Sequence, residues 1–465
     1  MCKRLYGVFG LSSLLVGAAS AQSVQKPNVI IILTDDLGYQ DIGCFGASSI
    51  KTPNLDQMAE DGCRFTSFYA AASVCSPSRA GLLTGRYPER NGLHGVYFPK
   101  DDQGYPLTEI MLSQVLKEQG YATACIGKWH LGHLPDYLPT HRGFDRYFGI
   151  PYSNDMWMDP QNIPPATNIV LREEKTLDDY FKTDRFRKGS APNQVPLMRN
   201  DRCVEWPAEQ ATLTRRYAEE GIRFIQSNKD RPFFLYLATA MPHVPLHASE
   251  PFLGKSARGL YGDCVEEIDW AVGEILQALK TEGLAEKTLV VFTSDNGPWL
   301  VQKENAGSAL PLRDGKGSTY EGGQRVPCIM WWPKTIPAGT VFFRTVSSLD
   351  LFPTVSVLAG AALPSDRMMD GHNILRILKN PETAVSPWNV FCYETTALRA
   401  GPWKFRNGPL YSRYHRKNNP DVIQLFNLDR DIGETVNLAD QYPEKVTQFR
   451  EMLDAYRQTV AGEEK

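Results

Sequence analysis

Apolar runs and amphipathic stretches alternate along the first two-thirds of the chain. Residues 29–33 are apolar at every position, which is typical of a strand covered by helices on both faces. Periodicity predicts helices at residues 54–61, 107–119, 211–227 and 265–281, and further strands at 121–126, 233–238 and 289–293. This alternation predicts an α/β fold in which helices sandwich a large, mixed, mostly parallel sheet.

The alternation of apolar and amphipathic segments changes at two places. Residues 155–203 are rich in proline, asparagine and charge, and they are predicted to form a long polar excursion. After residue 387, short aromatic segments predict strands at 390–394, 403–406 and 424–427, followed by a last helix at 444–459. We therefore predict a signal peptide at 1–21, a large α/β domain at 22–385 and a smaller antiparallel α+β subdomain at 386–465.

Composition narrows the class of protein. The 465 residues are 42% hydrophobic and 22% charged, as in an ordinary globular chain. The formal net charge is −3 and there is no long basic run, so no nucleic-acid partner is expected. The nine cysteines are scattered without a Cys-x-x-Cys pair, which disfavours both a disulfide framework and a zinc site.

The first residues have the pattern of a secretory signal. Lys3 and Arg4 precede an apolar stretch at 5–16, and Ala19-Ser20-Ala21 is a small-residue cleavage site. A short membrane anchor is the alternative, but no other segment approaches the length of a membrane span. The chain contains no Asn-x-Ser/Thr sequon, which favours a bacterial envelope protein. We expect a periplasmic or secreted bacterial protein with no integral membrane segment after signal cleavage.

The segment Cys75-Ser76-Pro77-Ser78-Arg79 places a thiol at the start of a predicted helix, with proline in the first turn. Backbone N–H groups at such a start attract an anion. Two interpretations stand at this point. Cys75 is either a thiol nucleophile or a residue that is converted into something other than cysteine.

Oxygen ligands follow two of the predicted strands. Asp35 and Asp36 follow the first strand, and Asp295 and Asn296 follow the strand at 289–293. Ligands of open α/β sheets bind at the carboxyl ends of strands, and Ca²⁺ or Mg²⁺ needs several oxygen ligands. The pattern predicts one hard-cation site, provided that the chain bends after Asp35, which Gly38 permits. Taken alone, Asp35-Asp36 is more typical of a pair of solvated loop acids, and Asp295-Asn296-Gly297 is more typical of a simple turn.

Cationic and imidazole side chains follow other strands. Lys128 and His130 follow the strand at 121–126, and they face the same side if the segment is extended. His243 lies between two prolines, and Lys316 lies in a glycine-rich segment that lacks the spacing of a nucleotide-binding loop. With Arg79, these groups suit a pocket for a tetrahedral oxyanion. Individually, they are as typical of surface lysines and structural histidines.

Together these residues resemble the type I sulfatases of the alkaline-phosphatase superfamily, in the branch of arylsulfatase A and N-acetylgalactosamine-6-sulfatase. The resemblance extends from about residue 27 to about residue 440. It rests on the C-x-P-x-R core and on four further segments: Ala80-Gly81-Leu82-Leu83-Thr84-Gly85, Asp35-Asp36, Gly127-Lys128-Trp129-His130 and Asp295-Asn296-Gly297. The likeness to this branch rests on residues 149–155 and 315–323. It implies an enzyme that hydrolyses sulfate monoesters.

The resemblance also implies a role for each site residue. Cys75 is the precursor of formylglycine, which a separate maturation enzyme generates. The implied Ca²⁺ ligands, with Mg²⁺ as the alternative ion, are Asp35, Asp36, residue 75, Asp295 and Asn296. The implied catalytic residues are Cys75, Arg79, Lys128, His130, His243 and Lys316. Lys128, His243 and Lys316 also contact substrate, together with Ser153.

Sulfated carbohydrates, such as glycosaminoglycans or algal galactans, are the expected substrates. Four tryptophans are candidates for stacking on sugar rings, although such residues more often pack internally: Trp157, Trp206, Trp299 and Trp403. Two alternatives remain at this stage. One is a phosphatase or phosphonate monoester hydrolase of the same superfamily, and the other is a glycan-binding relative in which Cys75 is unmodified.

Overall fold

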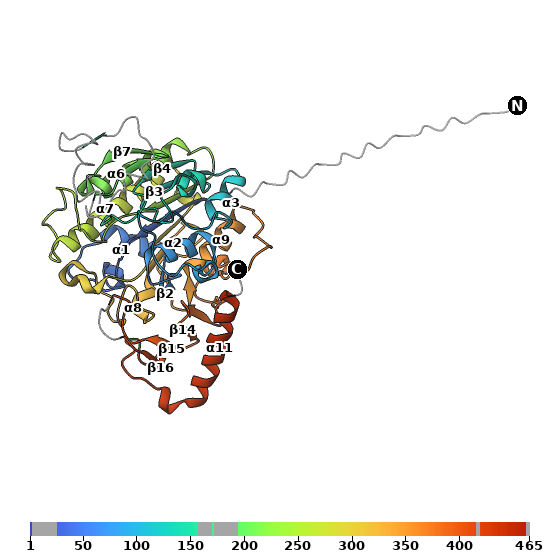
Figure 1. Cartoon of the computed structure of the whole chain (residues 1–465). Helices are drawn as coiled ribbons and strands as arrows, with labels where there is room; N and C mark the ends of the chain where they lie inside the picture. The colour runs from blue at the N-terminus through green and yellow to red at the C-terminus, as the bar shows by residue number, and fades with distance from the viewer. Residues whose placement is uncertain (2–25, 157–169, 172–193, 415–418, 462–465) are drawn as a thin grey trace.

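The computed structural model describes residue 1 and residues 26–156, 170–171, 194–414 and 419–461 (Figure 1). The predicted signal peptide, Trp157 and much of the polar excursion lie outside these residues. Among the residues described, no helix is both long and apolar enough to cross a bilayer. Each of the eight cysteines in this part of the chain is unpaired, in agreement with the prediction from their spacing.

A twelve-stranded sheet forms the centre of the described structure, and most of its neighbouring strands are parallel. Its middle consists of β9 (Thr288–Ser294), β1 (Asn28–Thr34), β8 (Phe233–Ala238) and β3 (Ala122–Gly127), in that order. On one side, β10 (Arg325–Trp331) runs antiparallel to both β9 and β2 (Cys63–Tyr69). The outer strands are β11 (Thr340–Phe342), β12 (Val346–Ser347), β4 (Arg146–Gly149), β6 (Leu197–Arg199), β7 (Arg202–Trp206) and β5 (Val170–Leu171).

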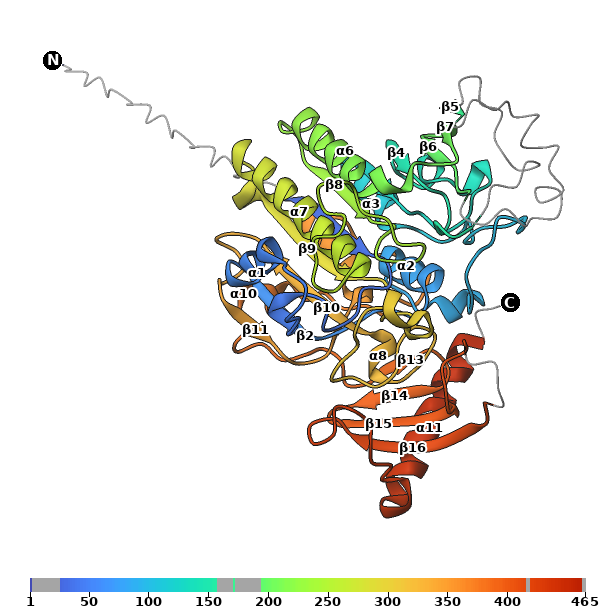
Figure 2. The same ribbon diagram turned by 90° about the vertical axis from the view of Figure 1, so that its left-hand side faces the viewer.

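Helices cover both faces of this sheet, because successive side chains of each strand point to opposite sides. Ile30 and Ile32 pack with one set of helices, whereas Val29 and Ile31 pack with the other. The first set is α1 (Pro53–Glu60), α6 (Leu213–Ser227) and α7 (Leu260–Thr281), of which α6 and α7 lie side by side in Figure 2. The second set is α2 (Cys75–Thr84), α3 (Leu112–Glu118), α9 (Leu351–Leu358) and α10 (Leu375–Lys379).

A second, four-stranded antiparallel sheet lies below the large one in Figure 1, beside the long helix α11 (Pro443–Ala461). Its strands are β13 (Phe391–Tyr393), β14 (Ala397–Ala400), β15 (Trp403–Pro409) and β16 (Asp421–Asn427). Phe391 and Phe405 share a core with Phe449 of α11 and with Tyr69 at the end of β2. The predicted fold class is therefore confirmed, whereas the domain boundary at 385–386 stays a prediction.

A buried ionic cluster joins the two sheets. The Lys404 ammonium of β15 lies 2.9 Å from Glu321 Oε1 and 3.0 Å from Glu434 Oε1, and none of the three side chains is exposed. Glu321 begins the short helix α8 (Glu321–Gln324), directly after the glycine-rich segment that carries Lys316. The cluster therefore ties the small sheet to a segment that reaches the candidate site.

Two predicted elements differ from the structure. The helix expected at 107–119 begins only at Leu112, because Met111 is extended (φ −94°, ψ 151°) and Leu107, exposed at the surface, lies in a turn. The polar excursion at 155–203 does not wholly interrupt the sheet. β6 and the start of β7 lie within it, and they add antiparallel strands beyond β4.

Candidate active site

Helix α2 begins at Cys75, and its ten residues are all buried. No side chain caps this end, so its first backbone N–H groups are free to face an anion. Cys75 itself is 2% exposed. Burial raises the pKa of its thiol to about 11, against the opposing effect of Lys128 and Lys316. Since the thiolate is the nucleophilic form, an unmodified Cys75 is a poor nucleophile at neutral pH, which argues against the interpretation as a thiol enzyme.

Asp35 and Asp36 are brought to the same side of the chain by a left-handed residue. Asp36 has a φ of 64°, a conformation that is uncommon for any residue other than glycine. The bend that sharing one ion requires therefore occurs at Asp36 itself. Such a conformation persists only where the surroundings hold it, and the Asp36 N–H donates to Asp295 Oδ1 at 3.2 Å.

Asp295 and Asn296 follow β9 and face the end of β1. Asp295 Oδ2 accepts two hydrogen bonds from Arg79, at 2.9 Å from Nε and 2.8 Å from Nη2. The Asn296 amide donates to Asp36 Oδ1 at 2.7 Å, which leaves Asn296 Oδ1 buried and without a hydrogen-bond partner among the described residues. Asp35 Oδ1 is likewise buried and lacks a hydrogen bond.

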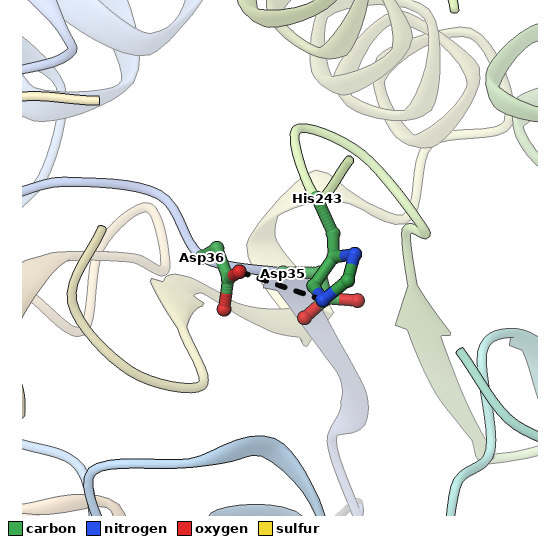
Figure 3. A group of neighbouring side chains, drawn as sticks. All are labelled: Asp35, Asp36 and His243. Carbon is green, nitrogen blue, oxygen red and sulfur yellow. Dashed lines mark ion pairs between the residues drawn. The ribbon is translucent and has the colours of Figure 1, made fainter. Parts of the chain in front are cut away.

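This set of oxygens fits a hard cation. Potential ligand atoms of Asp35, Asp36 and His243 (Figure 3) lie within 4.8 Å of one another. Those of Asp35, Cys75 and Asp295 also lie within 4.8 Å of one another. Buried oxygens that lack a partner are costly unless a ligand satisfies them, and oxygen ligands are those that Ca²⁺ and Mg²⁺ prefer. The structure therefore gathers Asp36, Cys75 and Asp295 around Asp35, while Asn296 contacts Asp36; that these five residues bind a cation stays a prediction.

Three buried cations balance the three carboxylates. Arg79 pairs with Asp295, and the Lys128 ammonium donates to Asp35 Oδ2. The Lys316 ammonium lies 2.7 Å from Asp36 Oδ2. Because the side chains alone are near neutrality, a divalent cation would give the site a net positive charge. The site is therefore suited to an anionic ligand.

Ser153 and Asn154 position His243. Ser153 Oγ lies 3.3 Å from the Lys128 ammonium and 3.5 Å from His243 Nδ1. The Asn154 amide donates to the Pro245 carbonyl at 3.1 Å and so holds the histidine segment, a contact that the sequence did not indicate. His243 Nε2 lies 3.6 Å from Asp36 Oδ2, the ion pair drawn in Figure 3.

Burial and the Lys316 charge lower the pKa of His243, while Asp36 acts in the opposite direction. An anion bound beside the ring would raise that pKa again. His243 therefore gains a proton more readily when the pocket is filled.

His130 lies near Lys128, Arg79 and Asp35, but its backbone conformation differs from the expected one. It has a φ of 62°, so the segment after β3 is not extended at this residue. His130 Nε2 lies 2.9 Å from the Tyr97 carbonyl, while Nδ1 is buried without a hydrogen-bond partner in the described part of the chain. Burial first, and then Lys128 and Arg79, hold the pKa of His130 well below its usual range. With the proton on Nε2, the free Nδ1 is a proton acceptor.

Among the candidate tryptophans that the structure describes, two pack internally and one lies at the site. Trp206 is fully buried and donates to the Gln194 carbonyl, and Trp403 of β15 packs on Tyr442. Trp299 lies at the site, where its ring centroid is 4.7 Å from the Lys316 ammonium and 5.4 Å from the His243 ring. Tyr414, which the sequence analysis did not single out, contacts Trp299 at 5.1 Å between ring centroids.

Fold and site together place three carboxylates, three cationic side chains and two histidines at the carboxyl edge of an α/β sheet. The family model described as Sulfatase matches residues 27–361. The chain belongs to the sulfatase family and is a sulfuric ester hydrolase.

Relatives and solved structures cover nearly the whole chain. It is 42% identical to the N-acetylgalactosamine-6-sulfatase of Canis lupus familiaris, over 92% of this chain and 84% of the relative. It is 39% identical to the arylsulfatase A of Homo sapiens, over 92% of this chain and 86% of the relative. The crystal structure of Ps i-CgsB in complex with k-i-k-neocarrahexaose superimposes with a TM-score of 0.74 at 33% identity, and the match covers 93% of each chain. The resemblance to this branch of sulfatases is thus confirmed.

Proposed function

We propose that this sulfatase removes sulfate from carbohydrate esters, with Cys75 converted to formylglycine and with Ca²⁺ bound by Asp35, Asp36, residue 75, Asp295 and Asn296. Mg²⁺ is the alternative ion. One observation carries the proposal: residue 75 is buried, as a high-pKa thiol, among unpartnered oxygens and three cations. That surrounding suits an oxygen nucleophile and an anionic ester better than a thiolate.

Two groups would be added to the chain as translated. Hydrated formylglycine supplies two hydroxyl groups on one carbon, one to take the sulfate and one to allow its release. A divalent cation supplies Lewis-acid stabilisation of charge on the sulfate oxygens. The proximity of Asp35, Asp36, Asp295 and residue 75 supports this proposal.

The chain's own side chains would do the remaining work. Arg79 and Lys128 hold residue 75 and its neighbouring carboxylates, and with Lys316 they offset the negative charge of the sulfate. His243 is the donor of a proton to the leaving alcohol, because bound sulfate raises its pKa. His130 is the acceptor of a proton at Nδ1, the ring atom that has no other partner. Ser153 orients both Lys128 and His243.

The substrate class follows from the relatives. One is an N-acetylgalactosamine-6-sulfatase, and the similar structure of Ps i-CgsB holds a carrahexaose. Both names point to carbohydrates. This agrees with the aromatic side chain of Trp299, which lies beside Lys316 and His243, two residues proposed to contact the sulfate ester. We therefore place the natural substrate among sulfated glycans.

A mass and rate measurement tests this function. Peptide mass spectrometry of the protein from a host that contains the maturation enzyme should show residue 75 as the aldehyde or its hydrate. The same sample should hydrolyse an aryl sulfate faster than the matched aryl phosphate. A faster phosphate rate would favour the phosphatase or phosphonate monoester hydrolase, and an unmodified thiol without turnover would favour the glycan-binding relative.

We also propose export across the inner membrane of a bacterial cell, on the basis of the signal pattern at 1–21. The proposal includes the maturation enzyme as a partner that acts on Cys75. Sequencing of the amino terminus of the protein recovered from a cell envelope or culture fluid should give a start near Gln22. Retention of Met1 in a cytoplasmic fraction would contradict export.

A further inference from the structure

Trp299 lies where the alcohol part of a bound ester must leave the sulfate pocket. Its ring is 4.7 Å from the Lys316 ammonium and 5.4 Å from the His243 ring, and these are the two residues proposed to face the leaving oxygen. A carbon attached to an oxygen held by these two residues would lie near Trp299. Trp299 is only partly buried, so part of the residue remains accessible to solvent.

The Trp299 N–H gives a second, independent indication of a ligand. Its nitrogen is buried and has no hydrogen-bond partner among the described residues. Buried tryptophan N–H groups usually find an acceptor, because an unpaired one costs free energy. A hydroxyl-bearing ligand on this ring would provide that acceptor, whereas an all-hydrocarbon ligand would not.

Tyr414 extends the aromatic surface from the other sheet. It follows β15, its ring centroid is 5.1 Å from that of Trp299, and the two ring planes meet at 53°. Burial raises the pKa of its hydroxyl to about 12, with Lys316 acting in the opposite direction. Tyr414 is therefore close to the sulfate-binding lysine although it belongs to the small antiparallel part of the structure.

Backbone contacts hold Tyr414 in place. Ser412 Oγ donates to the Lys316 carbonyl at 2.7 Å, and the Arg413 N–H donates to the Gly317 carbonyl at 2.9 Å. Gly317 in turn donates to the Ser73 carbonyl at 2.8 Å, two residues before Cys75. A Cβ at Gly317 would lie 2.7 Å from the Tyr414 ring, so the ring packs directly on the Lys316 segment. The position of Tyr414 is thus coupled to residue 75 itself.

We propose that Trp299 and Tyr414 form a two-ring surface that binds the pyranose ring of the sulfated substrate and determines specificity for sugars over other alcohols. This rests on the proposed function of the site and names the part of it that selects the substrate. An aromatic face with one N–H donor matches a sugar ring, which has an apolar face and hydroxyl groups at its edge. The neighbouring Arg413 is paired with Glu394 at 3.0 Å. Within the described part of this segment, the two rings and the Trp299 N–H are the groups that we assign to sugar recognition.

Steady-state kinetics on single variants test the proposal. Trp299→Leu, Trp299→Phe and Tyr414→Leu are compared with wild type on N-acetylgalactosamine 6-sulfate, on sulfated galactan oligosaccharides and on an aryl sulfate. Inorganic sulfate is measured in parallel as a competitive inhibitor. Tyr411→Leu is the matched control, because it removes an exposed aromatic ring from the same segment.

The two rings should act on the sugar and not on the sulfate. For the sugar ester that the wild type hydrolyses fastest, kcat/KM should fall about tenfold in Trp299→Leu and in Tyr414→Leu, since an aromatic contact contributes up to about 1.5 kcal/mol. The fall in kcat/KM should be smaller in Trp299→Phe, because phenylalanine keeps an aromatic ring and lacks only the N–H donor. The inhibition constant of inorganic sulfate and the rates of Tyr411→Leu should stay within about twofold of wild type.

Other outcomes overturn the inference without touching the proposed function. Equal losses on sugar sulfate and inorganic sulfate would mean that the rings only support Lys316, and unchanged sugar kinetics would mean that they bind nothing. A wild type that hydrolyses the aryl sulfate but no sugar ester would remove the assignment to sugars. Failure of the wild type on every sulfate ester would instead contradict the proposed function.

Discussion

Arg79 donates two hydrogen bonds to one oxygen of Asp295, at 2.9 and 2.8 Å, and neither side chain is exposed. Arg79 lies one turn into α2, and Asp295 directly follows β9. The pair therefore fixes the helix that begins with residue 75 to the strand end that supplies two of the proposed metal ligands. A planar guanidinium makes this forked contact, whereas an ammonium does not.

Replacing Arg79 should therefore affect catalysis more than folding. We expect Arg79→Lys to lower kcat on an aryl sulfate about 100-fold, a loss typical of removing one donor that stabilises a transition state. Arg86→Lys is the matched control, because Arg86 forms a similarly buried pair with Glu109 away from the site. Both variants should lose some thermal stability. An equal loss of kcat in the two variants would assign Arg79 a purely structural role.

Residue 75 provides a second prediction. Cys75→Ala and Cys75→Ser should both lack turnover, because neither side chain carries two hydroxyl groups on one carbon. Cys75 fills a small buried position at the start of α2, so both variants should melt within a few degrees of the wild type. Multiple-turnover kinetics and a thermal melt measure the two effects. Sustained turnover by Cys75→Ser would show that a single hydroxyl suffices.

Cation binding should stabilise the folded protein. Chelator-treated protein should gain thermal stability on addition of Ca²⁺, since a ligand that binds only the folded state adds about 2.7 kcal/mol at 100 times its dissociation constant. Asp35→Asn should abolish most of that gain, because Asp35 belongs to both groups of potential ligands. Asp350→Asn is the control: Asp350 is equally buried but accepts hydrogen bonds from Trp388 and backbone N–H groups. A gain that persists in Asp35→Asn would place the cation elsewhere.

The buried cluster between the two sheets predicts a large effect on stability. Lys404→Met leaves the carboxylates of Glu321 and Glu434 without their shared cation, and breaking a buried pair in this way costs about 3–5 kcal/mol. The control Lys334→Met breaks an exposed pair with Glu286 and should change the free energy of unfolding by less than about 1 kcal/mol. Chemical denaturation compares them. Similar stabilities for the two variants would contradict the structural importance of the cluster.

Glu89 should make stability depend on pH. Burial, together with the nearby Glu394 carboxylate, raises its pKa from 4.5 to about 8. Between about pH 4.5 and pH 8, Glu89 therefore keeps its proton in the folded state, whereas the same side chain loses it in the unfolded chain. The resulting stabilisation is complete below about pH 4.5 and is lost as the pH rises to about 8.

The neutral Glu89→Gln variant should lack this dependence. Its melting temperature should rise relative to that of the wild type between pH 5 and pH 8, with melts recorded at each pH in matched ionic strength. Tyr456 donates to Glu89 at 3.5 Å, and a glutamine carbonyl can accept that bond. A constant difference between variant and wild type over this range would show that Glu89 is ionised in the fold.

The central strands and most of the helices could be predicted from sequence because the apolar pattern that produces them is local. A strand buried on both faces is expected to be apolar, and β8 is so along its length, whereas β1 is apolar from Val29 to Leu33 between the polar residues Asn28 and Thr34. β2 was missed because charged and polar residues interrupt its pattern: Arg64 and Thr66 are only partly buried near one edge of the sheet. The start of α3 was misplaced because Met111 is apolar but extended, and hydrophobic periodicity does not report backbone angles.

The residues of the site could be named from sequence, but their arrangement could not. Asp36 and His130 both take left-handed backbone conformations that their residue types do not announce. The contacts of Asn154 with the histidine segment, and of Tyr414 with Trp299, join positions far apart along the chain. No local pattern encodes such pairs.

The sequence alone determined the α/β alternation and the likeness to sulfatases, because apolar periodicity and short motifs are properties of neighbouring residues. It also indicated which side chains were candidates for one common site. The tertiary structure decided which oxygens remain without partners, how burial changes the Cys75 thiol, and that the small sheet brings Tyr414 to the pocket. These depend on packing between distant segments, since desolvation and electrostatic interaction arise only when the chain has closed around the groups concerned.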